Sequence, residues 1–180
     1  MFGKNKFYLL VAVLLSLRLT NRANAQDELA AELSVFKPFI GKTWKGEFKN
    51  STKEKPVIDV ARWERALNGQ AIRVLHSVNN GEYGGESIIL WEAKQQSVVY
   101  YYFTTAGFYT HGTMKFEKNR FISHEYVSGN QNGITEVKGS GEITADGKMI
   151  SKSQYLQNGK WVDGHEAIYV EDATAQVVFK

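Results

Sequence analysis

Residues 66–81 read ALNGQAIRVLHSVNNG, and this stretch decides the fold. From Ile72 to Val78 every second side chain falls on one face, and that face is apolar apart from His76. A period of two is typical of a strand with one buried face. Asn68-Gly69 and Asn80-Gly81 bound the segment, and such pairs tolerate the positive φ angles of tight hairpin turns. The stretch therefore predicts a strand between two tight turns.

The same pattern recurs along most of the chain. Further turn signals stand between apolar runs at Lys118-Asn119, Asn132-Gly133, Asp146-Gly147 and Asn158-Gly159. The segments between turns are rich in Val, Ile, Thr, Tyr and Phe. We expect about ten strands, at 42–49, 57–67, 70–78, 86–92, 97–104, 109–117, 120–127, 134–144, 149–156 and 161–170.

A meander of this many short strands manages its exposed edges by closing on itself. No helical pattern alternates with the strands, which argues against a parallel α/β sheet. The predicted fold class is all-β: a single closed antiparallel meander barrel of about ten strands, preceded by a short N-terminal helix. The helix is expected because Asp27 can cap a segment bearing Leu29, Leu33 and Phe36, which Pro38 and Gly41 then end.

The N-terminus has the features of a cleavable signal peptide. Lys4 and Lys6 precede the apolar run 7–17, and Ala23-Asn24-Ala25 is an A-x-A cleavage site. The apolar run is shorter than the roughly 20 residues that a membrane-spanning helix needs, although an uncleaved anchor is the alternative. We predict a signal peptide at 1–25, one barrel domain at 26–180, a periplasmic or secreted location, and no stable membrane anchor after cleavage.

Charge and cysteine content exclude several classes of function. The whole chain has 22 basic and 19 acidic residues, but four of the basic residues lie in the leader. The mature chain therefore has 18 basic and 19 acidic residues, a net charge of −1, and we expect neither nucleic acid nor anionic lipid as a partner. Without cysteine, there is no disulfide, no thiolate catalysis and no Cys-ligated metal.

Three of the four histidines share a strand face with apolar or aromatic residues. His76 lies with Ile72 and Val78, His124 with Tyr126, and His165 with Trp161, Ala167 and Tyr169, while His111 accompanies Tyr109 and Thr113. Each could be an independent residue, buried with a hydrogen bond or lying at a rim. Alternatively, one inward imidazole ligates a haem iron or contacts a polar ligand group. No short chelating spacing such as H-E-x-x-H is present, so no metal site is expected.

Aromatic and charged residues supply further candidates for a ligand site. Residues 100–103 are Tyr-Tyr-Tyr-Phe, so both faces of that strand are aromatic. Tyr suits a partly wet cavity wall, and ordinary core packing is the alternative. Arg62 and Glu64 share a face, which is either the solvated outer face or an inward face with the arginine aimed at a ligand carboxylate.

Enzyme motifs are absent from the sequence. There is no G-x-S-x-G elbow, no G-x-x-x-x-G-K-S/T loop and no G-x-G-x-x-G opening a helix. Gly139-Ser140-Gly141 lies inside a predicted strand and better marks a bulge or sharp bend than a catalytic turn.

Residues 39–47, Phe-Ile-Gly-Lys-Thr-Trp-Lys-Gly-Glu, resemble the G-x-W-x-G opening of calycin-like barrels, among them lipocalins and nitrobindin-like proteins. In that pattern a short helix leads into the first strand and the Trp, here Trp44, plugs the closed end. The chain also resembles DUF1579, a bacterial family of uncharacterised function in this group. Shared features are a strand ending in L-x-G, as in 67–69, a run like 98–103 and G-x-x-x-x-G as in 107–112. The likeness covers about residues 33–170.

The first functional hypothesis is an exported binding protein, not an enzyme, that holds a small hydrophobic or amphipathic molecule in the barrel without a cofactor. The expected ligand-binding residues are Trp44, Arg62, His76, Tyr100, Tyr102, His124, Tyr126 and His165. The resemblance to nitrobindin-like proteins implies the second hypothesis, haem binding through His165, or failing that His124 or His76. A hydrolase or isomerase with a cavity His–carboxylate pair, such as His124 with a carboxylate across a strand, is the third. A solid structural scaffold is the fourth.

Overall fold

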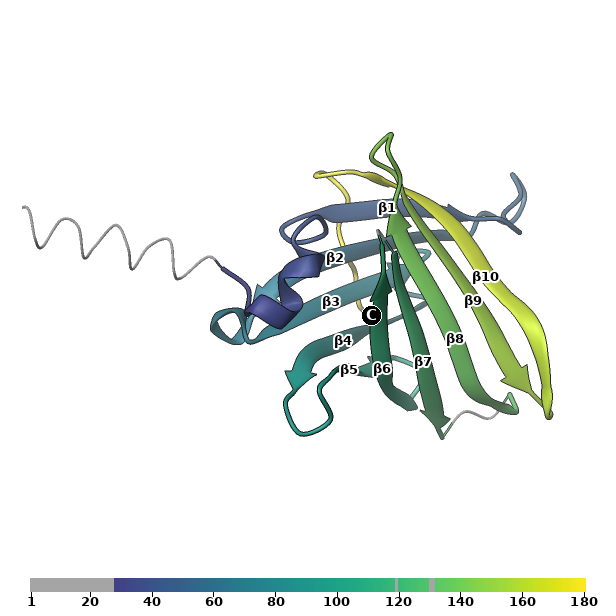
Figure 1. Ribbon diagram of the computed structural model, residues 1–180. Coiled ribbons are helices and arrows are strands. Elements are labelled where there is room, and N and C mark those ends of the chain that lie inside the picture. The colour runs from purple at the N-terminus through teal and green to yellow at the C-terminus, as the bar shows by residue number, and fades with distance from the viewer. Residues whose placement is uncertain (1–27, 119, 130–131) are drawn as a thin grey trace, which may run out of the picture.

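The computed structural model describes residues 28–118, 120–129 and 132–180 (Figure 1). The signal peptide prediction and the capping role of Asp27 lie outside the described residues. The strands are β1 (Thr43–Phe48), β2 (Ile58–Ala66), β3 (Ala71–Val78), β4 (Tyr83–Glu92), β5 (Ser97–Thr104), β6 (Tyr109–Glu117), β7 (Arg120–Ser128), β8 (Ile134–Ile143), β9 (Met149–Gln157) and β10 (Lys160–Glu171).

All ten strands form one closed barrel in which each pairs antiparallel with its neighbours along the chain. The barrel closes between the first and last strands, where Gly46 of β1 lies opposite Tyr169 of β10. Figure 1 shows the early strands crossing β7–β10 at a steep angle, as the strand tilt of a barrel requires. The prediction of a closed antiparallel barrel of ten strands is confirmed.

The turns use the residues that the sequence marked. Asn80 and Gly81 have φ angles of 57° and 89°, and Asn158 and Gly159 have φ angles of 51° and 78°. Residues other than Gly and Asn rarely adopt this left-handed region, so these pairs fix where the hairpins fall and hence the strand register.

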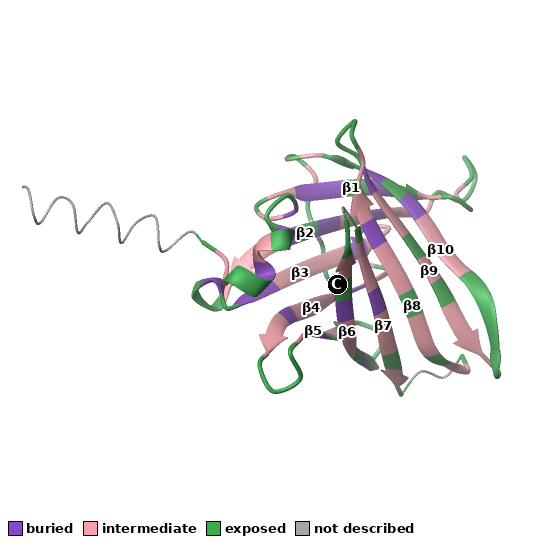
Figure 2. Ribbon diagram, in the orientation of Figure 1, coloured by how far each residue is buried: buried purple, intermediate pink, exposed green. Residues whose placement is uncertain are grey.

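One end of the barrel is closed by the segment before β1. A short 3₁₀ helix, η1 (Ala31–Phe36), leads to Phe39 and places Leu33 and Phe36 in the core. Phe36 is fully buried, and its ring lies 4.7 Å from that of Phe116, centroid to centroid. Trp44, also at 0% exposure, belongs to the same core. Figure 2 shows buried residues on η1 and on the neighbouring parts of β1–β4.

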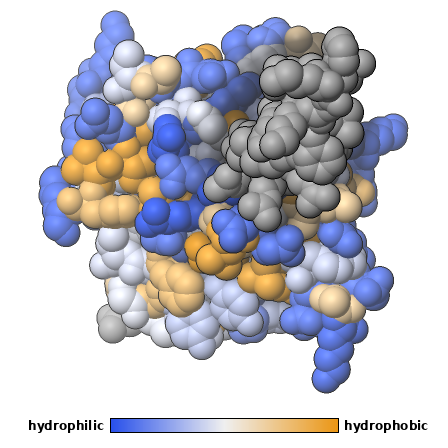
Figure 3. Space-filling view, turned by 90° about the vertical axis from the view of Figure 1, so that its left-hand side faces the viewer, coloured by the Kyte–Doolittle hydropathy of each residue, from blue (hydrophilic) through white to orange (hydrophobic). Residues whose placement is uncertain are grey.

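The outer surface near this end is mixed in character. Figure 3 shows hydrophobic residues gathered in patches between hydrophilic ones on this face. A tight turn, η2 (Leu67–Gly69), in which all three residues have positive φ angles, joins β2 to β3. In the part of the chain that the structure describes, no helix has the length and hydropathy to cross a membrane.

The tail after Glu171 runs over the outside of the barrel. Asp172 N–H donates to Thr43 C=O (2.9 Å), and Val178 N–H donates to the buried Ser77 Oγ (3.0 Å). Residues 177–179 belong to no strand, and the Val178–Ser77 hydrogen bond holds them against β3.

Candidate functional site

The half of the barrel away from η1 contains a cavity of about 590 Å³. Its wall includes the end of β3 at Val78, the start of β6 at Thr110, the end of β7 at Val127 and the start of β8 at Ile134. These strand ends meet at the end of the barrel opposite η1. Small-molecule sites typically have volumes of about 300–1,000 Å³, so the cavity has the size of a ligand site.

A row of hydrogen bonds runs along the cavity wall from β10 to β4. Asp59, 4% exposed, accepts a hydrogen bond from Tyr169 Oη (2.8 Å) and another from His76 Nδ1 (3.0 Å). His76 Nε2 lies 2.7 Å from Tyr102 Oη, which lies 3.0 Å from Tyr83 Oη. Burial raises the pKa of Tyr83, Tyr102 and Tyr169, so all three remain neutral hydroxyls. Both ring nitrogens of His76 are therefore engaged within the wall.

Glycines inside strands let these side chains meet. Gly46 lies between Tyr169 and Asp59 in one row across three strands, and a Cβ on Gly46 would clash with the Tyr169 ring. Gly112 lies between Tyr100 and Glu125 in the same way. In each row a tyrosine reaches over a bare backbone to a carboxylate two strands away.

Glu125 is the second carboxylate of the cavity. Thr110 Oγ1 donates to Glu125 Oε2, and the Tyr100 hydroxyl is a further hydrogen-bond partner. Burial raises the pKa of the Glu125 carboxyl, and these two hydrogen bonds oppose the rise only in part. The hydrogen-bond partners of the carboxyl inside the barrel are thus neutral. None of the described residues that line the cavity places a Lys or Arg side chain opposite it.

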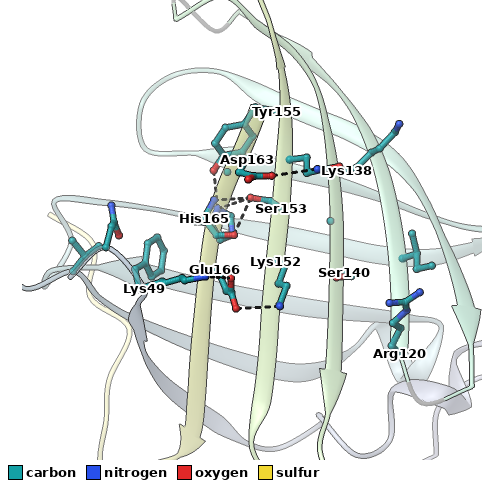
Figure 4. A pocket seen from close by; sticks show the side chains of 17 residues that line it. Lys49, Arg120, Lys138, Ser140, Lys152, Ser153, Tyr155, Asp163, His165 and Glu166 are labelled. Carbon is teal, nitrogen blue, oxygen red and sulfur yellow. Dashed lines mark hydrogen bonds and ion pairs between the residues drawn. The ribbon is translucent and has the colours of Figure 1, made fainter. Parts of the chain in front are cut away.

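His165 faces the cavity from β10, next to a β-bulge. The register shifts between Asp163 and Glu166, and Ser153 Oγ accepts from the His165 backbone N–H (3.0 Å). Tyr155 Oη and Ser153 Oγ lie 2.7 Å and 3.0 Å from His165 Nδ1 (Figure 4). His165 Nε2 has no hydrogen-bond partner among the described residues.

The environment of the His165 ring keeps it neutral. Its ring stacks on Phe48, with centroids 5.2 Å apart and planes 19° apart. Burial lowers the pKa of the imidazole, because the charged form loses solvation. The side chain therefore presents a neutral, oriented imidazole to the cavity.

A second depression, of about 990 Å³, borders β8–β10 and shares His165, Ser153 and Tyr155 with the cavity. Two of its lysines, Lys49 and Lys152, are each ion-paired to Glu166 at 3.1 Å, as Figure 4 shows. Its other two cations are Arg120, 3.5 Å from Glu117, and Lys138, whose Nζ lies 4.1 Å from the centroid of the Trp161 ring.

Four of the predicted ligand residues line the cavity: His76, Tyr100, Tyr102 and His165. Their role as ligand contacts stays a prediction. Trp44 lies in the core of the closed end and does not border the cavity.

The inward placement of His124 and Tyr126 is wrong. Phe121, Ser123, Glu125 and Val127 are the β7 residues that line the cavity, so the alternate residues face outward. Tyr126 is 50% exposed, and His124 Nε2 pairs with Glu136 across the outer face (2.7 Å). The predicted pairing of His124 with a carboxylate across a strand therefore exists, but outside the cavity.

Arg62 also faces outward and does not line the cavity, and a role for it in ligand binding stays a prediction. Its Nε pairs with Glu64 (2.7 Å), and its Nη1 donates to Thr43 Oγ1 (3.1 Å). The solvated outer face, the other interpretation of this pair, is the correct one.

The position of the β-bulge differs from the prediction. Pairing of β8 with β9 runs without a shift from Glu136 to Ile143, so the prediction of a bulge at 139–141 is wrong. The bulge at Gly164 instead separates Trp161, on the outer face beside His124, from His165, on the inner face.

Sequence reasoning missed several cavity residues: Asp59, Tyr83, Glu125, Ser153 and Tyr155. For Asp59 and Glu125 a signal existed, because each lies at an alternate position with apolar residues of its strand. Asp59 shares its face with Ala61 and Trp63. Within the described ranges, no three His, Asp or Glu side chains are grouped so that they could hold a metal ion.

Comparison with known proteins gives the fold and little more. No protein-family model matches the chain, and no curated protein sequence matches it significantly. The structure is similar to the crystal structure of Rv2717c from M. tuberculosis, with a TM-score of 0.60 and 13% identity over 80% of this chain and 99% of that chain. At this identity the likeness shows a shared barrel fold, and membership of DUF1579 stays a prediction.

Proposed function

We propose that this chain is an exported binding protein of the calycin-like, DUF1579-related type, which holds one small hydrophobic or amphipathic molecule in the open half of its barrel. The single observation that carries the proposal is the 590 Å³ cavity, with its oriented polar groups, inside a barrel whose other half is filled by side chains. The interior of a purely structural protein is normally close-packed, so a space of this size argues against a solid scaffold. Ligand pockets usually have a mainly apolar wall with a few polar groups in fixed positions.

Native mass spectrometry of the full chain, produced with its own leader and purified without detergent, tests this proposal. Val127→Trp fills the cavity mouth from β7, and Ser128→Trp is the matched control because Ser128 is the next residue and faces outward. We expect added mass on the wild type and on S128W but not on V127W. Added mass that V127W retains would contradict a cavity site, and a bare mass for all three would contradict retention of a ligand.

The export part of the proposal is supported by the leader pattern at 1–25. Cell fractionation followed by intact-mass measurement checks it. We expect the mature chain, beginning at Gln26, in the periplasm or medium. A full-length chain in the cytoplasm would contradict export and would leave the cavity proposal standing.

Haem binding is the second candidate, and His165 favours it. A neutral imidazole suits an axial ligand when one nitrogen is held by Tyr155 and Ser153 and the other has no partner among the residues that the structure describes. The rest of the cavity does not fit haem, because haem carries two carboxylates and the wall already holds Asp59 and Glu125 without an inward Lys or Arg among its described residues. Haemin titration of the wild type, H165A and the outer-face control H124A tests this candidate. A Soret shift lost only in H165A would support it, and no shift in the wild type would contradict it.

A further inference from the structure

The wall of the cavity has an uneven balance of charge. Two carboxylates, Asp59 and Glu125, line it. Lys152 is the one Lys or Arg among its described lining residues, and its side chain is 57% exposed and ion-paired to Glu166 on the outer surface. The two lining histidines supply no positive charge for a further anion. His76 is hydrogen-bonded to Asp59, and burial lowers the pKa of His165 and so favours its neutral form.

The two carboxylates differ in how well they are satisfied. Asp59 has two short hydrogen bonds, from Tyr169 and His76, and serves to orient them. Among the described residues, the hydrogen-bond partners of Glu125 within the cavity are the neutral hydroxyls of Thr110 and Tyr100. The other groups that act on it electrostatically are Tyr83 and Tyr102 across the barrel and His124 on the far face of its own strand. A buried carboxylate without a cation is costly, and a cationic ligand would remove that cost.

Aromatic rings surround the same space. Tyr83, Tyr100, Tyr102, Phe108 and Tyr155 all line the cavity. Ring faces attract cations through their quadrupole, and aromatic cages with a nearby carboxylate are a recurrent way to bind ammonium groups. An anionic head group would instead meet two carboxylates and, among the described lining residues, no Lys or Arg other than the ion-paired Lys152.

Resting on the proposed binding function, we infer that the ligand is a cationic amphiphile, a protonated or quaternary amine on an apolar body, whose ammonium group lies at Glu125 among the tyrosines. The apolar body then extends along the wall formed by residues such as Val127, Val137 and Met114. The ammonium supplies the missing counter-charge, and the rings exclude water from the ion pair.

Three probes with one tail and different heads test the inference: decyltrimethylammonium, decanol and decanoate, titrated calorimetrically below their micelle concentrations. We expect the quaternary cation to bind at least about tenfold more tightly than decanoate, an energy difference of about 1.4 kcal/mol. The quaternary head cannot lose its charge, so the comparison does not depend on the protonation of the probe. Equal or tighter binding of decanoate or decanol would overturn the inference while supporting the cavity, whereas no binding of any probe would contradict the cavity proposal itself.

Glu125→Gln locates the cation. Gln keeps the shape and the acceptor for Thr110 but removes the charge, so the affinity for decyltrimethylammonium should fall about tenfold and that for decanol should not change. Glu136→Gln is the matched control, since Glu136 lies on the adjacent strand but pairs with His124 on the outer face. An equal loss in E136Q, or no loss in E125Q with a folded protein, would overturn the placement.

Discussion

The two halves of this barrel differ in what fills their interior. Around η1 the interior is filled by large apolar side chains, and Phe36, Phe39 and Trp63 contact one another ring to ring. In the other half the interior holds hydroxyls, two carboxylates and two imidazoles around a 590 Å³ space. Apolar packing is therefore concentrated at one end of the barrel and polar side chains around a cavity at the other, along the same ten strands.

The largest expected effect lies in the filled half. Phe36→Ala should lower the free energy of unfolding by about 3–5 kcal/mol, because it deletes a fully buried ring from a packed cluster. Urea denaturation measures this loss. A loss below about 1 kcal/mol would contradict the assignment of the packed core to this end.

A smaller effect is expected from the buried carboxylate of the hollow half. Asp59→Ala leaves Tyr169 Oη and His76 Nδ1 without their acceptor, and should cost about 2 kcal/mol, less than F36A because cavity water replaces part of the bonding. Tyr169→Phe removes one of the two donors and is the control in the same denaturation series. If D59A lowered the free energy of unfolding as much as F36A does, the two halves would not differ in their contribution to stability.

Glu125 should make stability depend on pH. Below its ordinary pKa of 4.5 the carboxyl is protonated in both the folded and the unfolded chain. Because burial raises the pKa in the folded chain, stability is lost as the pH rises through that raised value. Glu125→Gln lacks this loss, so its stability relative to wild type should increase from about pH 4 upward and then level off.

Denaturation of wild type and E125Q across that pH range checks the prediction. Tyr83, Tyr100 and Tyr102 stay neutral there because burial raises their pKa values. His124, the remaining titratable group near Glu125, is common to both proteins. A stability difference that is independent of pH would contradict a desolvated Glu125.

The smallest effects are expected on the outside. His124→Ala and Tyr126→Ala should each change the free energy of unfolding by less than about 1 kcal/mol, because the side chains are 40% and 50% exposed and the ion pair and ring contacts that they make lie on the outer face. Ligand binding should not change in either variant. Loss of binding in H124A, measured by the same calorimetry, would place the ligand on the outer face.

The positions of the strands could be predicted from the sequence. Which face of each strand lines the interior could be predicted only in part. Turn pairs such as Asn158-Gly159 require backbone angles that few residues adopt, so they fixed where strands begin and end. On β7, the face that carries aromatic Tyr126 was predicted to be the inner one. In the structure Tyr126 lies on the outer face and Glu125 lines the cavity. A hollow, polar interior inverts the usual contrast between inside and outside on which the face assignment depends.

The β10 bulge shows a second limit. A shift of one residue at Gly164 moves Trp161 to the face opposite His165, and nothing in the alternation of residues 161–170 reveals it. The hydrogen-bonded rows through Gly46 and Gly112 depend on pairing across three strands, which only the closed register supplies.

The most direct test of the hollow half is a fluorescence titration with the neutral amphiphile N-phenyl-1-naphthylamine, for wild type, V127W and S128W. The cavity account predicts saturable binding of one probe per chain in wild type and S128W, and loss of that binding in V127W. Unsaturable binding, or equal binding by all three folded proteins, would contradict a ligand site inside this barrel.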